Sequence, residues 1–115
     1  MADNCVFCAI VKKEIPAKIV GESPEWMSFH DIHPQAPVHI VLIPKKHLNS
    51  ISDFNRKNGS LASEMIFELG RIAEKAHLGQ SGYRIVVNSN ADGGQTVPHL
   101  HFHLLGGRSM KWPPG

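Results

Sequence analysis

Histidines alternate with large apolar residues at one place in the chain, where His99, His101 and His103 occur. The apolar residues that follow each of them are Leu100, Phe102 and Leu104. Because a β-strand sends successive side chains to opposite faces, we expect the three imidazoles on one face and the apolar side chains in a core. The outer two histidines would be about 13 Å apart, whereas metal–imidazole bonds are only about 2 Å long. One ion can therefore bind two neighbouring imidazoles, which leaves at least one histidine for other chemistry.

The composition excludes several classes of protein. Hydrophobic residues make up 42% and charged residues 19% of 115 residues, which is typical of one globular domain, residues 1–115. The formal net charge is only +2 and the basic residues are scattered, so we expect no nucleic-acid partner. No apolar run approaches the roughly 18 residues of a membrane span. Asp3 and Asn4 come early and no apolar signal-peptide core follows them, so we expect no signal peptide. We therefore expect a cytoplasmic protein that does not bind membranes.

Hydrophobic periodicity predicts five strands, at residues 18–22, 26–30, 38–43, 83–88 and 99–105. Apolar residues recur every three or four positions over residues 60–78, which predicts one main helix capped by Ser60 and Gly79. A short helix over residues 6–13, capped by Asn4, would precede the strands. Strands grouped around one main helix indicate an α+β fold with a mostly antiparallel sheet.

Two cysteines, Cys5 and Cys8, form a Cys-x-x-Cys pair near the N-terminus. A disulfide framework would need more cysteines and an oxidising compartment. A redox pair usually opens a helix after a strand, but only four residues precede this pair. Half of a metal site is a third interpretation, and the eight histidines of the chain keep it open. The fourth is that both side chains simply pack inward as small apolar groups.

The histidines are suited to phosphoryl transfer, which needs an in-line nucleophile and groups that stabilise charge on the phosphate oxygens. Neutral imidazole is a competent nucleophile near pH 7, provided that one ring nitrogen is free and the other donates a hydrogen bond. The acceptor of that bond would be a backbone carbonyl or His39. The turn at residues 93–96 can form an anion-binding nest from its N–H groups, although a Gly-Gly pair is often only a turn. The sequence holds no carboxylate cluster for magnesium.

The pattern His-x-His-x-His-x-x with apolar x, at residues 99–105, resembles the signature of the histidine-triad (HIT) superfamily. Further segments are similar to the Hint branch of that superfamily: 29–32 (FHDI), 34–39 (PQAPVH), 43–47 (IPKKH), 93–95 (GGQ), 104–108 (LLGGR) and 112–115 (WPPG). The similarity extends from about Cys5 to Gly115. The Hint branch comprises purine nucleoside phosphoramidases, which hydrolyse adenosine or guanosine 5′-phosphoramidates to the monophosphate and an amine.

The resemblance implies a HIT-like fold, in which the five-stranded sheets of two copies join into a ten-stranded sheet of a homodimer. It implies that His101 is the nucleophile and forms a nucleotidyl-histidine, that His103 contacts the phosphate, and that His39 orients the nucleophilic ring. The expected partner is a purine nucleotide, and we expect catalysis to need no cofactor. The tail, residues 108–115, is expected at the dimer interface and the edge of the active site.

By the same resemblance, Asp31 and Ile32 hold the ribose and base, and four residues form the phosphate side: Asn88, Gly94, Gln95 and Thr96. Thr96 also stands where many Hint proteins have a serine that is thought to help the leaving amine. Threonine keeps the hydroxyl, but its methyl group restricts the rotamer. Pro98 replaces a frequent tyrosine and removes a backbone donor. We expect both departures to change leaving-group preference without abolishing activity.

Some HIT proteins bind structural zinc, and the matching ligands in this sequence are Cys5, Cys8, His47 and His99. Such a set makes a coordinatively closed tetrahedral site, and it leaves His101 and His103 for catalysis. Other functions stay open. A nucleotide-binding regulatory or scaffold protein with incidental catalysis would keep every one of these residues, and a zinc-dependent interaction domain would need only the metal ligands. The Trp-Pro-Pro-Gly ending and Arg108 argue against a dinucleoside polyphosphate hydrolase or nucleotidyltransferase.

Overall fold

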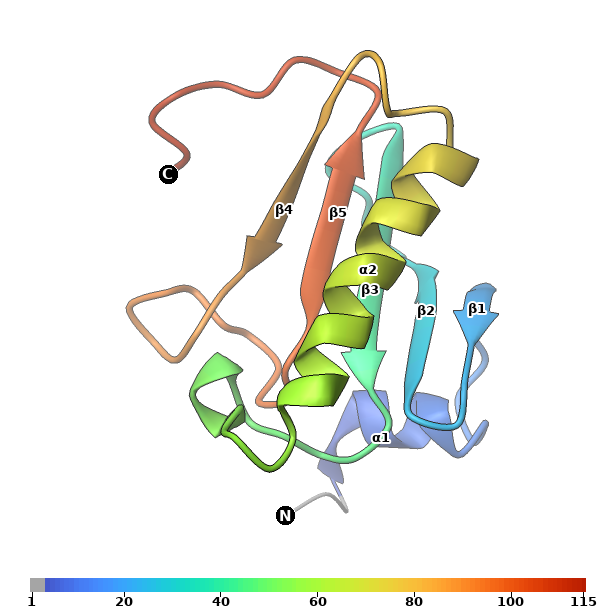
Figure 1. Ribbon diagram of the computed structural model, residues 1–115, viewed down its shortest axis with the longest axis vertical. Helices are drawn as coiled ribbons and strands as arrows, with labels where there is room; N and C mark the ends of the chain where they lie inside the picture. The colour runs from blue at the N-terminus through green and yellow to red at the C-terminus, as the bar shows by residue number, and fades with distance from the viewer. Residues whose placement is uncertain (1–3) are drawn as a thin grey trace.

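The computed structural model describes residues 4–115, and its strands form one five-stranded sheet (Figure 1). The strands are β1 (Ile19–Glu22), β2 (Trp26–His30), β3 (Val38–Pro44), β4 (Tyr83–Val87) and β5 (Phe102–Gly106). Their order across the sheet is β1-β2-β3-β5-β4, and every neighbouring pair is antiparallel. This arrangement confirms the predicted α+β class and the five-stranded antiparallel sheet. It also puts β3 and β5, which carry the histidines, side by side near the centre.

The main helix, α2 (Gly59–Lys75), lies across one face of the sheet (Figure 1). Its apolar residues at three- and four-residue spacing, Leu61, Met65, Leu69 and Ile72, are buried. They pack against strand residues that point to the same face, including Ile40, Leu42, Phe102 and Leu104. Burying one such side chain stabilises the fold by about 1.5–3 kcal/mol. This core therefore fixes the face of the sheet toward which the apolar side chains that alternate with the histidines point.

The short helix α1 (Val6–Val11) covers part of the opposite face. Ile10 is buried there with four residues of the second and third strands: Met27, Phe29, Val41 and Ile43. Partly buried Phe7 packs against the same group. The packing of α1 therefore holds the two cysteines, which lie at its start, against the sheet.

The helix ends differ from the sequence prediction. The cap of α1 is Cys5, whose Sγ accepts a hydrogen bond from the backbone N–H of Cys8, so Asn4 is not the cap. Helix α2 begins at Gly59 after Asn58, not at Ser60, because the Asn58 amide is used in the preceding turn. It ends before His77, which has a left-handed φ of 62°, and so does not reach Gly79. All three differences concern single turns at the helix ends.

Strand β5 begins at Phe102, so the predicted strand 99–105 is too long at its start. The backbone before it bonds elsewhere, because the N–H of Leu100 donates to the carbonyl of Leu48 at 2.7 Å. The alternation nevertheless persists, since Leu100 lies in the main core and His101 faces the histidine side. A short 3-10 turn, η2 (Ile51–Asp53), links β3 to α2. Over residues 4–115, no helix is both long and apolar enough to cross a membrane.

Candidate active site and metal centre

The orientation of His101 is set by the backbone. Its ring Nδ1 lies 2.7 Å from the carbonyl oxygen of His99, and a carbonyl can only accept, so Nδ1 carries the proton. The other ring nitrogen, Nε2, therefore holds a free lone pair. The side chain is only 4% exposed. A buried imidazole with one nitrogen fixed as donor has the arrangement that a nucleophile needs.

His39 and His103 meet beside it on the same face of the sheet. The Nε2 atom of His39 lies 2.9 Å from Nδ1 of His103, and the rings of His101 and His103 have centroids 4.9 Å apart. The resemblance implies that His39 orients the ring of His101. In this structure the hydrogen bond of the His101 ring goes to the His99 carbonyl, and His39 contacts His103.

The proton positions in this pair follow from Gln35. Its backbone N–H donates to Nδ1 of His39 at 3.0 Å, so the proton of neutral His39 must sit on Nε2. That Nε2–H then donates to Nδ1 of His103, and His103 carries its own proton on Nε2. The result is a relay that ends in an N–H donor beside the lone pair of His101. A donor next to a nucleophile is suited to a phosphate oxygen.

Burial keeps this relay neutral. It lowers the pKa of His103 to about 4, with smaller contributions from the neighbouring His101 and His39. Burial also lowers the pKa of His39, and the Asp31 carboxylate partly opposes that effect. Asp31 Oδ2 lies 3.4 Å from Nε2 of His39. The hydrogen-bond directions derived for neutral rings therefore hold at neutral pH.

A cleft of about 650 Å³ opens next to the relay, and its lining includes Asp31, Ile32 and His39. Asp31 is held in place because its Oδ1 accepts the backbone N–H of His33 at 2.8 Å. Ile32 leaves 83% of its surface exposed. The cleft thus brings a fixed carboxylate and an apolar side chain together with the imidazole of His39, which contacts His103.

The loop between β4 and β5 carries the residues expected on the phosphate side. Gly93 cannot be another residue without a shift, because a Cβ there would lie 2.5 Å from the carbonyl oxygen of Ser89. Gly94 has φ +79°, which also favours glycine. Asn88 directly follows β4, and continuing the pairing of Val87 with Phe102 places it opposite His101. Among the described residues, no hydrogen bond joins Gly94 or Thr96 to the imidazoles.

The side-chain amide of Gln95, a residue expected on the phosphate side, bonds within the protein. Its side-chain Nε2 donates to the carbonyls of Asn49 (2.6 Å) and Val97 (3.0 Å), and its Oε1 accepts the N–H of Asn90 (2.8 Å). Both amide protons are thus engaged within the protein. Gln95 holds the loop to the segment after β3, and so it supports the phosphate side without offering a free donor to it.

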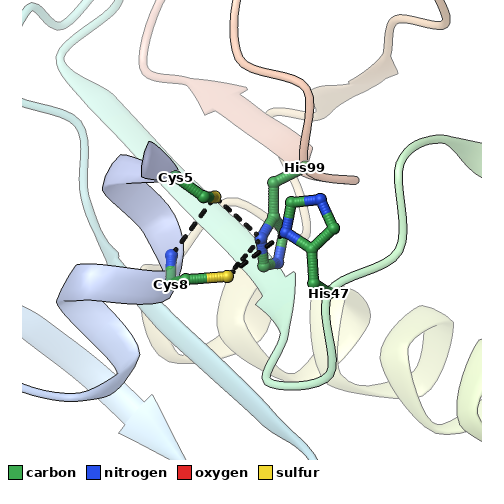
Figure 2. A group of neighbouring side chains, drawn as sticks. All are labelled: Cys5, Cys8, His47 and His99. Atoms are coloured by element: carbon green, nitrogen blue, oxygen red, sulfur yellow. Dashed lines mark hydrogen bonds between the residues drawn. The ribbon is translucent and has the colours of Figure 1, made fainter. Parts of the chain in front are cut away.

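The second cluster joins Cys5, Cys8, His47 and His99, as predicted, with one ligand atom of each within 4.8 Å of the others (Figure 2). The two thiols come from the start of α1, His47 from the segment after β3 and His99 from the residues before β5 (Figure 2). The Sγ–Nδ1 distances are 3.2, 3.2 and 3.5 Å. These residues lie close enough to hold a metal ion.

The donor set fits a tetrahedral ion. Bonds of about 2.0–2.3 Å put neighbouring tetrahedral ligand atoms roughly 3.3–3.8 Å apart. The Nε2–H of His99 donates to the Pro44 carbonyl at 2.9 Å, and Nε2 of His47 lies 3.1 Å from Oδ1 of Asn49. Each Nδ1 therefore points its lone pair at the thiols, as outer hydrogen bonds do in metal sites. Burial and a hydrogen bond with Cys5 raise the pKa of Cys8 to about 11. Deprotonating this thiol is therefore unfavourable, and a bound cation would offset that by stabilising the thiolate.

A third group, Asp31, His39 and His103, also has its ligand atoms within 4.8 Å of one another. The Gln35 N–H decides its chemistry. Because this donor occupies Nδ1 of His39, Nε2 carries a proton and cannot also offer a lone pair to an ion. We therefore interpret this group as a hydrogen-bonded relay and only the cysteine–histidine cluster as a metal centre.

Sequence reasoning missed several contributors. Phe7 lies edge-on to both His99 and His101, with ring centroids 5.8 and 5.1 Å away. Its position between the two cysteines was a usable signal. The Pro44 carbonyl and the Gln35 amide act through the backbone, for which a side-chain pattern gives no signal.

Comparisons with known proteins agree with this geometry. The sequence matches the HIT domain over residues 12–110. It is 39% identical to the purine nucleoside phosphoramidase of Escherichia coli (strain K12), over 96% of this chain and 92% of that protein. An uncharacterized HIT-like protein of Synechocystis is 43% identical over the full length of both. A HIT family hydrolase from Legionella pneumophila Philadelphia 1 superposes with a TM-score of 0.95 at 47% identity, covering 97% of this chain and 100% of that one. With the family's histidine motif placed on a matching fold, the chain belongs to the HIT family.

Proposed function

We propose that the chain is a hydrolase that cleaves the phosphorus–nitrogen bond of purine nucleoside 5′-phosphoramidates. The observation that carries this proposal is the tautomer of His101, whose Nδ1–H bond to the His99 carbonyl leaves Nε2 free to attack phosphorus. The substrate class follows the name of the Escherichia coli relative, a purine nucleoside phosphoramidase. The HIT family hydrolase from Legionella supports the hydrolytic reaction.

The reaction takes two displacements at phosphorus. In the first, Nε2 of His101 bonds to phosphorus, the phosphorus–nitrogen bond of the substrate breaks, and the amine leaves with a proton that the Thr96 hydroxyl passes on from solvent. In the second, water attacks the same phosphorus and the bond to His101 breaks. The nucleoside monophosphate leaves, and the proton of the water returns to solvent. Neither displacement calls for a cofactor.

His103 stabilises both displacements. Its Nε2–H, fixed by the relay from Gln35 through His39, donates to a non-bridging phosphate oxygen as negative charge develops there. We assign the rest of the phosphate side to Asn88, Gly94 and Thr96, with Gln95 supporting the loop. In the 650 Å³ cleft, Asp31 binds the ribose hydroxyls and Ile32 contacts the purine.

The test is turnover of adenosine 5′-phosphoramidate, followed as release of AMP and ammonia. Wild type and a His33→Ala control, which alters an exposed histidine outside the relay, are expected to turn over alike. His101→Ala is expected to be inactive, and wild type that is denatured during turnover in alkaline detergent should carry a nucleotidyl group that this variant lacks. Binding of AMP without turnover by wild type would instead favour the nucleotide-binding regulatory or scaffold function.

We propose zinc as the occupant of the cysteine–histidine cluster, because two thiolates and two imidazoles at these distances suit a closed tetrahedral site. Such thiolates persist in a reducing compartment, which fits a cytoplasmic protein. Purified, reduced protein should contain one zinc per chain, and Cys5→Ser should lower both zinc content and melting temperature. Metal analysis well under one zinc per chain would refute the assignment.

We propose a homodimer in which β4 pairs with β4 of a second copy. The strand ends the sheet order, and its Tyr83 and Ile85 side chains are 41% and 39% exposed. Helix α2 exposes Ile66 and Phe67, 54% and 77%, and so adds apolar surface. Light scattering should give twice the chain mass, and Ile85→Lys should give the mass of one chain; a single-chain mass for wild type would refute the dimer.

A further inference from the structure

His99 belongs to both sites at once. Its ring Nδ1 lies 3.2 Å from the Cys5 thiol in the metal centre, and its backbone carbonyl accepts the Nδ1–H of His101 at 2.7 Å. The residue is fully buried. One residue therefore connects the metal ligands to the group that fixes the tautomer of His101.

The sheet does not set the direction of that carbonyl. Residues 99–101 precede β5, whose pairing begins at Phe102. The stretch is held by the N–H of Leu100 on the Leu48 carbonyl and by the contacts of the His99 ring. The His99 peptide, whose carbonyl accepts from His101, is thus held in two ways: by the Leu100 N–H, which lies in the same peptide plane, and by the contacts of the His99 ring.

Helix α1 adds a second connection. Phe7 lies between the two cysteines in sequence, and its ring edge meets His101 at a centroid distance of 5.1 Å. It also packs on Phe29 at 5.7 Å. An ion that ties both thiols of α1 to His47 and His99 would hold Phe7 against the imidazole of His101.

We propose that the metal centre is a positioning device for the nucleophile: the ion fixes the His99 ring, and through the His99 carbonyl it keeps His101 in its Nδ1–H tautomer. This inference rests on the proposed function for the role of His101. With the ion bound, the His99 ring is held on two sides, by metal at Nδ1 and by the Pro44 carbonyl at Nε2. Without the ion the ring loses one of these, the His99 peptide keeps mainly the bond of the Leu100 N–H to the Leu48 carbonyl, and part of the His101 population carries its proton on the attacking nitrogen.

The first experiment records ¹⁵N NMR of histidine-labelled protein, zinc-loaded and after removal of zinc by a chelator. We expect the Nδ1–H tautomer at His101 with zinc and a mixture of tautomers without it. In the same samples, kcat for adenosine 5′-phosphoramidate should fall by the same factor as the Nδ1–H population of His101, about twofold for an even mixture, with KM unchanged because uniform binding is kept. An unchanged tautomer and kcat in folded, zinc-free protein would reduce the centre to a structural cross-link and overturn the proposal.

The second experiment uses the reciprocity of coupling and needs no turnover. Zinc affinity is measured by competition with a chromophoric chelator in wild type, His101→Ala and His103→Ala. Removing the His101 donor should weaken zinc binding roughly fivefold or more, whereas His103→Ala, which has no bond to His99, should leave it unchanged. Equal affinities in all three proteins would refute the coupling.

The two experiments separate the possible failures. If zinc controls the His101 tautomer but no phosphoramidate is turned over, the proposed function fails and the positioning role stands. If chelation unfolds the chain, the affinity comparison decides after each apparent zinc affinity is corrected for that variant's own free energy of unfolding.

Discussion

His39 and His103 lie diagonally across two neighbouring strands, and their rings meet with Nε2 of one 2.9 Å from Nδ1 of the other. The register of β3 and β5 pairs Val41 with His103 and His39 with Leu105. The two imidazoles thus share a face without being directly opposite, and this offset brings ring nitrogen to ring nitrogen. Through this contact, the backbone N–H of Gln35, which bonds to His39, determines which nitrogen of His103 carries the proton.

His39→Leu should lower kcat about 10–100-fold, because His103 then loses the donor that keeps its own proton on Nε2. His39→Gln should recover much of the loss, since an amide offers an acceptor to the Gln35 N–H and a donor to His103. Steady-state kinetics on adenosine 5′-phosphoramidate would check both. Equal rates for the leucine and glutamine variants would show that His39 acts only by filling space.

The stability of the fold should decrease in mild acid because His103 is buried neutral. Its pKa is about 4 in the folded protein and near 6.5 in the unfolded chain. Between these values the unfolded state binds the additional proton, so stability rises with pH in this window and is lost as pH falls from about 6.5 toward 4. The change is on the order of 1–3 kcal/mol for this one group, because His103 is only partly buried and solvent screens part of the shift. His39 shifts in the same direction.

Urea unfolding of zinc-saturated protein at several pH values measures this dependence, and His103→Gln is the matched variant. A glutamine cannot take up a proton, so the slope of stability against pH should flatten. Identical slopes in both proteins would mean that another group causes the acid sensitivity.

Burial patterns made most of the fold predictable from sequence. The two-residue period of the histidine stretch and the period of α2 both reflect which side chains reach the core, and Leu104 and Leu69 lie there as expected. The helix ends were harder to predict from the sequence. The Asn58 side-chain amide bonds within a turn, and His77 has a left-handed backbone conformation that is uncommon for histidine.

The cysteine–histidine cluster was predictable because zinc is bound by few types of side chain, Cys, His, Asp and Glu, and the motif positions indicated which of them would lie close together. The orientation of the His101 ring could not be predicted in this way. Its Nδ1–H donates to the main-chain carbonyl of residue 99, which any residue at that position would supply. The resemblance placed Gln95 on the phosphate side, but the sequence does not show that the carbonyl of Asn49, far along the chain, accepts a hydrogen bond from its amide.

Gln95→Glu should detach the loop between β4 and β5. The substitution keeps the shape but turns the amide that donates to Asn49 and Val97 into an oxygen facing two carbonyl oxygens. We expect a loss of about 1–3 kcal/mol, seen as a drop in melting temperature of roughly 4 °C or more, with faster amide exchange over residues 90–97. Gln80→Glu, the same change at an exposed position after α2, is the control and should have little effect. Matching behaviour of the two variants would remove Gln95 from its supporting role.

Deleting residues 109–115 should change substrate preference more than folding. The start of the tail lies near the cleft, because Nε of Arg108 donates to the Gln35 carbonyl at 3.0 Å, and Arg84 holds the tail through the Lys111 carbonyl at 2.9 Å. Most of the deleted residues are exposed, so the melting temperature should change little. The ratio of kcat/KM for bulky over small amine leaving groups, measured with a panel of adenosine phosphoramidates, should shift several-fold. Arg84→Gln, which removes only the 2.9 Å bond, should give a smaller shift in the same direction. If truncation lowers activity equally on all substrates, or leaves activity on every substrate unchanged, the tail has no part in substrate preference.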